Sequence, residues 1–168
     1  MRIAWTGHRP ELFERPDVAR ELVARETDRL LAEHGPRLVV LSGGQRGVDL
    51  WAASAALERG VRLQLLLPAP PALLAADWPA DDAEVLASAV GAAEQVTIFG
   101  RDPADPAGYD ARNRALAAAC DLLVAVWTGL EQGGTFFTLT AARALGKPIR
   151  EFRLAPSDYR PLPGERGI

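Results

Sequence analysis

The chain has 168 residues, of which 48% are hydrophobic and 24% charged, the composition of one ordinary globular domain. Its formal net charge of −3 argues against a nucleic-acid-binding protein, because such proteins usually carry a surplus of basic residues. The single cysteine, Cys120, excludes an intramolecular disulfide, and two histidines in separate segments do not complete a zinc site.

Strand-like and helix-like segments alternate along the chain. Short apolar runs predict six strands, at residues 2–6, 38–41, 61–67, 95–99, 122–127 and 149–152. Helical periodicity between them predicts helices at about 17–34, 47–59, 81–93, 106–120 and 134–145. Candidate N-caps are Asp17, Asp81 or Asp82, and Asp105. The proline-rich residues 68–79 are expected to form a loop.

This alternation predicts an α/β, Rossmann-like, doubly wound fold with a mostly parallel sheet of about six strands and helices on both faces. We assign residues 1–152 to a single nucleotide-binding domain and the Pro/Gly-rich residues 153–168 to a C-terminal tail. The first residues lack the long apolar core of a signal peptide, and prolines interrupt the most apolar stretch. We therefore expect a cytoplasmic protein without a membrane span.

Glycines and polar residues gather directly after the predicted strands. In open parallel sheets, ligands bind outside the carboxyl ends of the strands, so these positions are the candidate ligand contacts. They come from the stretches TGHR, SGGQRG, YDARNR, WTG and QGGT. The candidates are Thr6, Gly7, His8, Arg9, Ser42, Gly43, Gly44, Arg46, Gly47, Asp49, Arg112, Asn113, Thr128, Gly129, Gly133, Gly134 and Thr135.

Two of these stretches, SGGQRG at 42–47 and QGGT at 132–135, each open a predicted helix. Glycines let backbone N–H groups approach a ligand, and a helix N-terminus adds partial positive charge, so both suit a phosphate or pyrophosphate. Neither matches a dinucleotide-binding or P-loop fingerprint, and Lys147 is the only lysine. For either cluster alone, a tight strand-to-helix turn is the simpler interpretation; the presence of both favours a binding site.

Several candidates have two possible roles. Arg112 and Arg114 lie two residues apart on one helix, so we expect only one, Arg112, to reach the cleft. Asp49 either accepts from a ribose hydroxyl or caps the loop's N–H groups, and Arg46 faces either a second phosphate or solvent. His8 either contacts the ligand or fixes its loop. No serine nucleophile is indicated, and no catalytic residue is assigned.

The motifs TGHRP at 6–10, SGGQRGVDLWAA at 42–53, YDARN at 109–113 and CDLLVAVW through GGT at 120–135 together resemble the SLOG superfamily. The likeness is greatest to its small YpsA-like members and extends to about residue 149. The resemblance implies a Rossmann-like fold that binds nucleotides or nucleotide-derived ligands, and a homo-oligomer.

Two related groups imply different activities. The lonely-guy phosphoribohydrolases share an arginine matched by Arg112 and a glycine motif partly matched by Gly133, Gly134 and Thr135, but their glutamates do not carry over, because Phe136, Phe137 and Thr138 occupy that region. A hydrolase of this type needs a carboxylate, for which Glu131 and Asp49 are the substitutes. The DNA-processing protein A group, which binds single-stranded DNA, shares stretches similar to SGGQRGVD and RNR.

The sequence therefore predicts a protein that binds a phosphate-bearing or ADP-ribose-like nucleotide, as a sensor or regulatory protein. It requires no cofactor other than a possible bound nucleotide. A nucleoside 5′-monophosphate phosphoribohydrolase and a single-stranded DNA-binding protein are the alternatives; membrane association is not expected, and nucleic acid is the less favoured partner.

Overall fold

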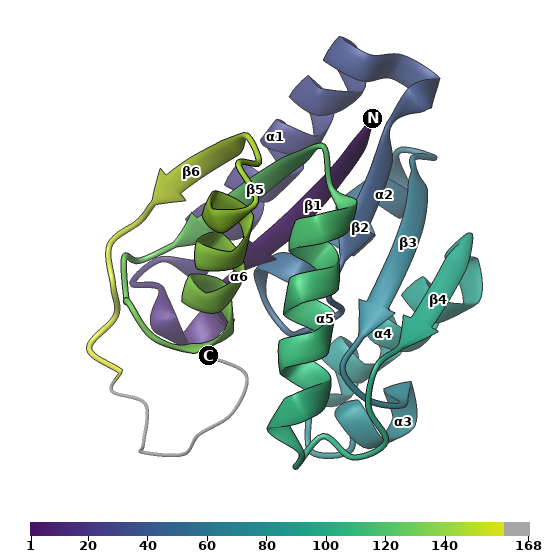
Figure 1. Ribbon diagram of the computed structural model, residues 1–168, viewed down its shortest axis with the longest axis vertical. Coiled ribbons are helices and arrows are strands. Elements are labelled where there is room, and N and C mark those ends of the chain that lie inside the picture. Colours follow the sequence, from purple (N-terminus) through teal and green to yellow (C-terminus); the bar gives the residue numbers. More distant parts are fainter. Residues whose placement is uncertain (160–168) are drawn as a thin grey trace.

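The protein folds into a single six-stranded parallel sheet flanked by helices. A computed structural model describes residues 1–159. Its strands are β1 (Arg2–Gly7), β2 (Val39–Ser42), β3 (Arg62–Leu67), β4 (Gln95–Ile98), β5 (Leu122–Trp127) and β6 (Ile149–Arg153). Its α-helices are α1 (Pro16–His34), α2 (Val48–Glu58), α3 (Pro71–Leu74), α4 (Ala80–Ala92), α5 (Pro106–Ala119) and α6 (Gly133–Ala144). Two 3-10 turns, η1 (Pro10–Leu12) and η2 (Gly35–Arg37), flank α1 (Figure 1).

The sheet has the strand order β4-β3-β2-β1-β5-β6, and every neighbouring pair is parallel. The chain moves outward from β1 to β4 and then returns to place β5 on the other side of β1. The order reverses there, so β1 and β5 flank the topological switch point, where sheets of this type bind ligands. The Rossmann-like α/β fold is confirmed, and the sheet is wholly parallel where the sequence indicated mostly parallel.

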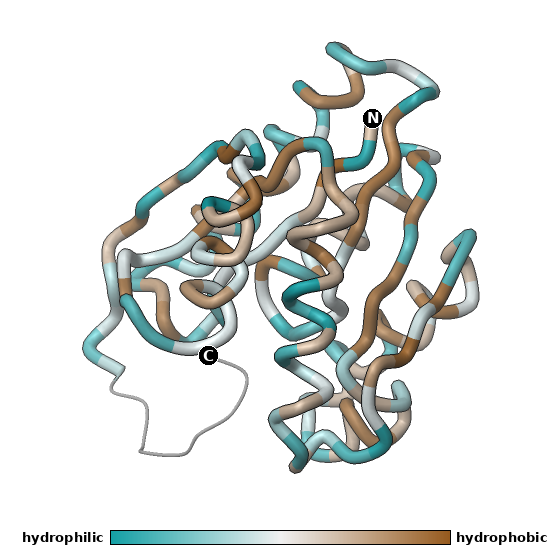
Figure 2. The backbone as a smooth tube through the Cα atoms, viewed as in Figure 1, coloured by the Kyte–Doolittle hydropathy of each residue, from teal (hydrophilic) through white to brown (hydrophobic). Residues whose placement is uncertain are grey.

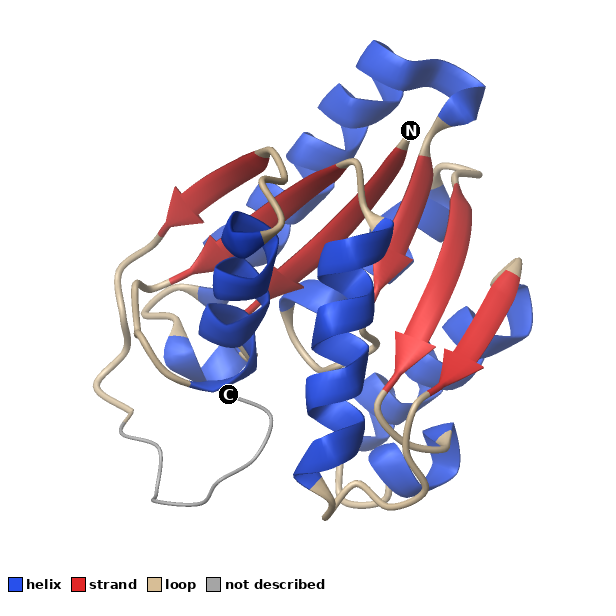
Figure 3. Ribbon diagram, in the orientation of Figure 1, coloured by secondary structure: helices blue, strands red, loops and turns tan. Residues whose placement is uncertain are grey.

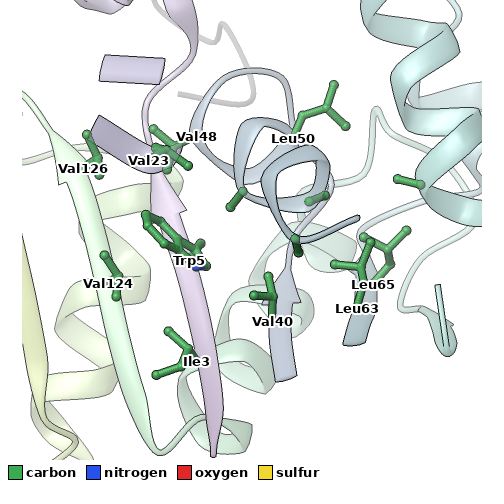
Figure 4. Packing of buried hydrophobic residues seen from close by; sticks show 14 of the residues in the cluster. Ile3, Trp5, Val23, Val40, Val48, Leu50, Leu63, Leu65, Val124 and Val126 are labelled. Atoms are coloured by element: carbon green, nitrogen blue, oxygen red, sulfur yellow. The ribbon is translucent and has the colours of Figure 1, made fainter. Parts of the chain in front are cut away.

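Each face of the sheet is covered by its own helices. Helices α1, α2 and α4 pack on one face and α5 and α6 on the other (Figures 1 and 3). The tube in Figure 2 shows the central strands as the most hydrophobic part of the chain. Alternate residues of β1 supply the two cores: Ile3 and Trp5 face α2 and Val23 of α1 (Figure 4), and Ala4 faces α5 and α6. A strand buried on both faces is apolar throughout, as β5 is.

The local predictions were correct at one helix start and wrong at two. Asp105 caps α5 by accepting from the N–H of Ala107, with proline following it. Asp17 does not cap α1, because Pro16 already occupies the first turn and the Asp17 carboxylate binds Arg15. Helix α4 has no side-chain cap; its first turn carries Asp81 and Asp82.

Two segments contain more structure than the sequence indicated. The stretch 68–79, expected to be a loop, contains the one-turn helix α3. Arg153, assigned to the tail, is the last residue of β6. After β6, residues 155–157 are tied to η1 and the residues that follow it. The Ala155 carbonyl accepts from the Glu14 N–H, and the Ser157 N–H donates to the Leu12 carbonyl. Residues 160–168 of the predicted tail lie outside the described residues, and the domain boundary after residue 152 stays a prediction.

In the described part of the chain, none of the helices combines the length and apolarity needed to span a bilayer.

Candidate functional site

The predicted candidates gather at the carboxyl edge of the sheet, the edge marked by the arrowheads in Figure 3. TGHR spans the end of β1, SGGQRG the end of β2 and WTG the end of β5, while QGGT opens α6. Arg112 and Asn113 are buried on α5 and approach the same edge, where Arg112 reaches Gly43. The sheet topology thus joins stretches that are far apart in the sequence, and β1 and β5 place two of them at the switch point.

The glycines of SGGQRG are packed against neighbouring atoms. A Cβ on Gly43 would lie 1.7 Å from Arg112 Nη1, and one on Gly44 would lie 2.3 Å from Leu67. A Cβ on Gly47 would lie 2.4 Å from the His8 carbonyl oxygen, and Gly47 also has a φ of 86°. These contacts allow no side chain, so the glycines are needed for the fold itself.

Most of this loop's N–H groups have partners within the protein. The Gly44 N–H donates to the Ser42 hydroxyl, which itself donates to the Asp49 carbonyl. The Gln45 backbone lowers the pKa of the Asp49 carboxyl, and the Arg46 N–H donates to the Gln45 side chain. At the start of α2, the Val48 N–H donates to the His8 carbonyl. These internal hydrogen bonds therefore hold the loop in its conformation without a ligand.

A buried ion pair lies beneath the loop. Arg112 Nη1 donates to the Gly43 carbonyl at 2.8 Å and to Asp49 Oδ2 at 3.1 Å, and the two side chains are 5% and 7% exposed. Burial raises the pKa of Asp49 to about 6, although the Arg112 charge and the hydrogen bonds to the carboxylate act in the opposite direction. Arg112 Nε is buried and has no hydrogen-bond partner. Asp49 thus binds one nitrogen of the Arg112 guanidinium, and Nε has no partner.

His8 connects the ends of β1 and β5. Its imidazole Nδ1 lies 3.4 Å from the Thr128 N–H and 3.2 Å from the Thr128 hydroxyl. The side chain is fully buried, and desolvation lowers its pKa from 6.5 to about 4, so the ring is neutral near pH 7. Nδ1 is therefore the ring nitrogen with a partner, whereas Nε2 is buried and has none among the described residues.

The start of α6 is more open. Gln132 is the N-cap residue but makes no side-chain cap hydrogen bond. Gly133 is exposed, and Gly129 and Gly133 have φ angles of 86° and 76°, which favour glycine. Thr135 is buried one residue beyond Gly134. The first turn of a helix has N–H groups without intrahelical partners, so this end offers donors to an anion.

The remaining candidates have structural partners. Arg46 binds Glu11 at 2.8 Å and Asp82 at 2.7 Å, and so joins the loop to η1 and α4 rather than facing solvent. Thr6 and Gly7 end β1, and a Cβ on Gly7 would lie 2.3 Å from the Val126 carbonyl oxygen. Arg9 is the N-cap of η1.

Aromatic and arginine side chains around α6 were missed by sequence reasoning. Trp127 stacks on Phe136 with ring centroids 6.5 Å apart, and the Arg153 guanidinium lies 5.1 Å from the Trp127 ring centroid. The Arg114 guanidinium lies 5.4 Å from the centroid of Phe137. Phe136 and Phe137, in the region of the expected glutamates, therefore stack on a tryptophan and contact an arginine, respectively. Only the sheet topology reveals the contact between Arg153 and Trp127, because these two residues lie on different strands, β6 and β5, that pair side by side.

Two other features bear on the chemistry. Among residues 1–159, no group of three or more His, Cys, Asp or Glu side chains is arranged to hold a metal ion. A groove of about 380 Å³ between α2 and α4 is lined in part by Glu58, Asp81 and Glu84. Those carboxylates make it unsuitable for an anionic nucleotide.

Solved structures share this fold at low sequence identity. TM1055, a structural-genomics target, aligns with a TM-score of 0.56 and 22% identity over 88% of this chain and 71% of its own. DNA processing protein A (DprA) from Streptococcus pneumoniae aligns with a TM-score of 0.63 and 18% identity over 89% of this chain. This chain spans 49%, about half, of that protein. No protein-family model matches the sequence, and no curated protein sequence matches it significantly.

Proposed function

We propose that this protein binds a nucleotide or nucleotide-derived ligand through its phosphate groups at the carboxyl edge of the sheet, and acts as a sensor or regulatory protein. The observation that carries the proposal is the uncapped N-terminus of α6, with Gly133 exposed, beside the β1–β5 switch point. The resemblance of the four sequence motifs to YpsA-like SLOG proteins supports the same ligand class.

The charges near α6 also support an anionic ligand. Arg114 and Arg153 both contact aromatic rings at this end of the molecule, and Arg153 Nη1 lies 3.9 Å from the position of a Cβ on Gly129. Guanidinium groups held by aromatic rings remain charged and offer planar donors to phosphate. We therefore propose that one phosphate of the ligand binds at Gly133 and Gly134.

The SGGQRG loop has a supporting role in this proposal. Its glycines and internal hydrogen bonds give the ligand a preorganised wall, with Ser42, Asp49 and Arg112 beneath it. Preorganisation reduces the entropy lost when a ligand binds. His8, neutral and buried at the junction of β1 and β5, supports this wall through its contacts with Thr128.

The alternative activities have weaker support. Phosphoribohydrolase chemistry needs an available carboxylate; Asp49 is bonded to Arg112, and Glu131 is exposed in the loop before α6. DNA binding has the fold likeness to DNA processing protein A in its favour and the net charge of −3 against it. Release of free base from AMP, or salt-dependent binding of an oligonucleotide, would move the assignment to one of these.

A thermal-shift panel with AMP, ADP, ATP, NAD, ADP-ribose and cyclic dinucleotides tests the proposal. A ligand at about 100 times its dissociation constant adds about 2.7 kcal/mol, or several degrees for a domain of this size. Gly133→Ala should reduce that shift, because it places a Cβ at the proposed phosphate contact.

Gly60→Ala is the matched control for that variant. Gly60 has a similar positive φ, 65°, but lies beyond the end of α2, so it reproduces the backbone strain away from the site. We expect both variants to lose stability and only Gly133→Ala to lose ligand binding. No shift with any nucleotide would overturn the proposal.

A further inference from the structure

The guanidinium of Arg112 is only partly used by the protein. Within the described residues, Nη1 of Arg112 donates two hydrogen bonds, to the Gly43 carbonyl and to the Asp49 carboxylate. Nε is buried and has no partner. Nε and Nη2 form the opposite edge of the guanidinium, a pair of parallel donors that matches two oxygens of a phosphate or carboxylate. A buried donor without a partner is costly, so Nε on this edge favours the binding of an acceptor.

Asp49 is the only carboxylate bonded to Arg112 among residues 1–159. Arg46, on the same loop, is already engaged by Glu11 and Asp82. From the β1 side, His8 contributes its carbonyl to Val48, and its imidazole is neutral; Arg9 has its Cα 2.8 Å from the position of a Cβ on Gly47. From α5, the Arg112 guanidinium carbon lies 5.8 Å from the Tyr109 ring centroid. Arg112 therefore provides the main positive charge that balances Asp49.

We propose that an anionic group of the ligand binds the Nε–Nη2 edge of Arg112 and that Asp49 takes up a proton as it does so. The inference rests on the proposed nucleotide-binding function and adds a means of regulating it. Two anions would then share one buried cation, and like charges at close range disfavour ionisation of both. The ligand phosphates stay ionised, so the proton goes to the carboxylate of Asp49.

Several features prepare Asp49 for this step. Its carboxyl is buried, and its pKa of about 6 is already close to the pH of most binding experiments. Arg112 is only 4% exposed, so an anion bound to it lies in a low-dielectric environment and acts strongly on the Asp49 carboxylate. Binding is therefore coupled to a proton.

The test is titration calorimetry with ADP-ribose as the probe, in two buffers of different ionisation enthalpy. The diphosphate of ADP-ribose keeps its charge near neutral pH, so it does not itself exchange protons there. We expect the wild type to take up close to one proton per ligand at about pH 7.5 and much less at about pH 5, where Asp49 is already protonated. Over that range the dissociation constant should rise by up to about tenfold per pH unit above about pH 6.

Two variants assign the proton. Asp49→Asn should bind ADP-ribose with no proton uptake and a flat pH dependence, whereas His8→Gln should retain the uptake. Uptake that persists in Asp49→Asn, or disappears in His8→Gln, overturns the inference; if Asp49→Asn does not fold, His8→Gln and the wild type still decide it. Binding without proton uptake overturns this inference alone, whereas no nucleotide binding at any pH overturns the proposed function as well.

Discussion

Arg112 Nη1 occupies the space in which a Cβ of Gly43 would lie, with only 1.7 Å between the nitrogen and the Cβ position. The same Cβ would lie 2.5 Å from Asp49 Oδ2. The lack of a side chain at Gly43 therefore leaves room for the buried ion pair. The position of Arg112 on α5 requires glycine at position 43 in the loop after β2. This contact joins two sequence motifs that are 69 residues apart.

Gly43→Ala is expected to destabilise the protein by at least about 2 kcal/mol, since backbone or the buried pair must shift to admit the methyl group. Gly91→Ala is the matched control: Gly91 lies in α4 with open space around its Cβ position, and alanine is the better helix former. Urea unfolding of both variants measures the difference. If Gly43→Ala is as stable as the wild type, the close packing described here is wrong.

Much of the fold was predictable from the sequence because its signals are local. The apolar runs predicted six strands close to their observed bounds. The alternation of strands and helices predicted a parallel sheet with helices on both faces. The N-cap at Asp105 was correct for the same reason, since Asp-Pro is a local helix-start signal.

The site was less predictable, because its main contacts are between distant segments. The sequence favoured Arg112 over Arg114, but it gave no sign that Arg112 binds Asp49. Arg153 was placed outside the domain, yet its guanidinium lies over Trp127 of β5. The strand order determines which strands lie side by side and so which distant residues meet. No local sequence pattern predicts that order.

The dependence of stability on pH should reveal two opposing buried groups. The folded pKa of Asp49, about 6, lies above its ordinary value of 3.8, so its contribution to stability is fully present below about pH 3.8 and is lost as pH rises through about 6. The folded pKa of His8, about 4, lies below its ordinary 6.5, so its contribution is present above about pH 6.5 and is lost as pH falls to about 4.

These two slopes should nearly cancel in the wild type between about pH 4 and pH 6. Asp49→Asn should then show stability that rises with pH, and His8→Gln stability that falls with pH, each by up to about 1.4 kcal/mol per pH unit. Denaturant unfolding at a series of pH values measures both slopes. Identical pH profiles for the two variants would contradict the burial described for these groups.

Ser42→Ala is expected to cost about 1–3 kcal/mol, because it leaves the buried Gly44 N–H without its acceptor and also removes a bond to the Asp49 carbonyl. Thr27→Val is the control: Thr27 is equally buried, but its hydroxyl bonds only the Val23 carbonyl within α1. The control should lose less stability and no nucleotide affinity. Equal losses in the two variants would show that Ser42 has no special role in bracing the loop.

Arg46→Gln should lower stability modestly, by about 1 kcal/mol, because it breaks two partly exposed ion pairs, with Glu11 and with Asp82. Added salt should lower the stability of the wild type toward that of the variant, since it screens these charges. Nucleotide affinity should change little, because Arg46 already has two carboxylate partners. A large loss of affinity with unchanged stability would instead place Arg46 in contact with the ligand.

The most direct test of the proposed site is an amide NMR titration of the ¹⁵N-labelled protein with ADP-ribose. We predict the largest shifts at the N–H groups of Gly133, Gly134 and Thr135, with smaller shifts at Thr128, next to His8. Shifts confined to the α2–α4 groove, around Ser54 and Ser88, or no shifts with this or any other nucleotide, would contradict phosphate binding at the start of α6.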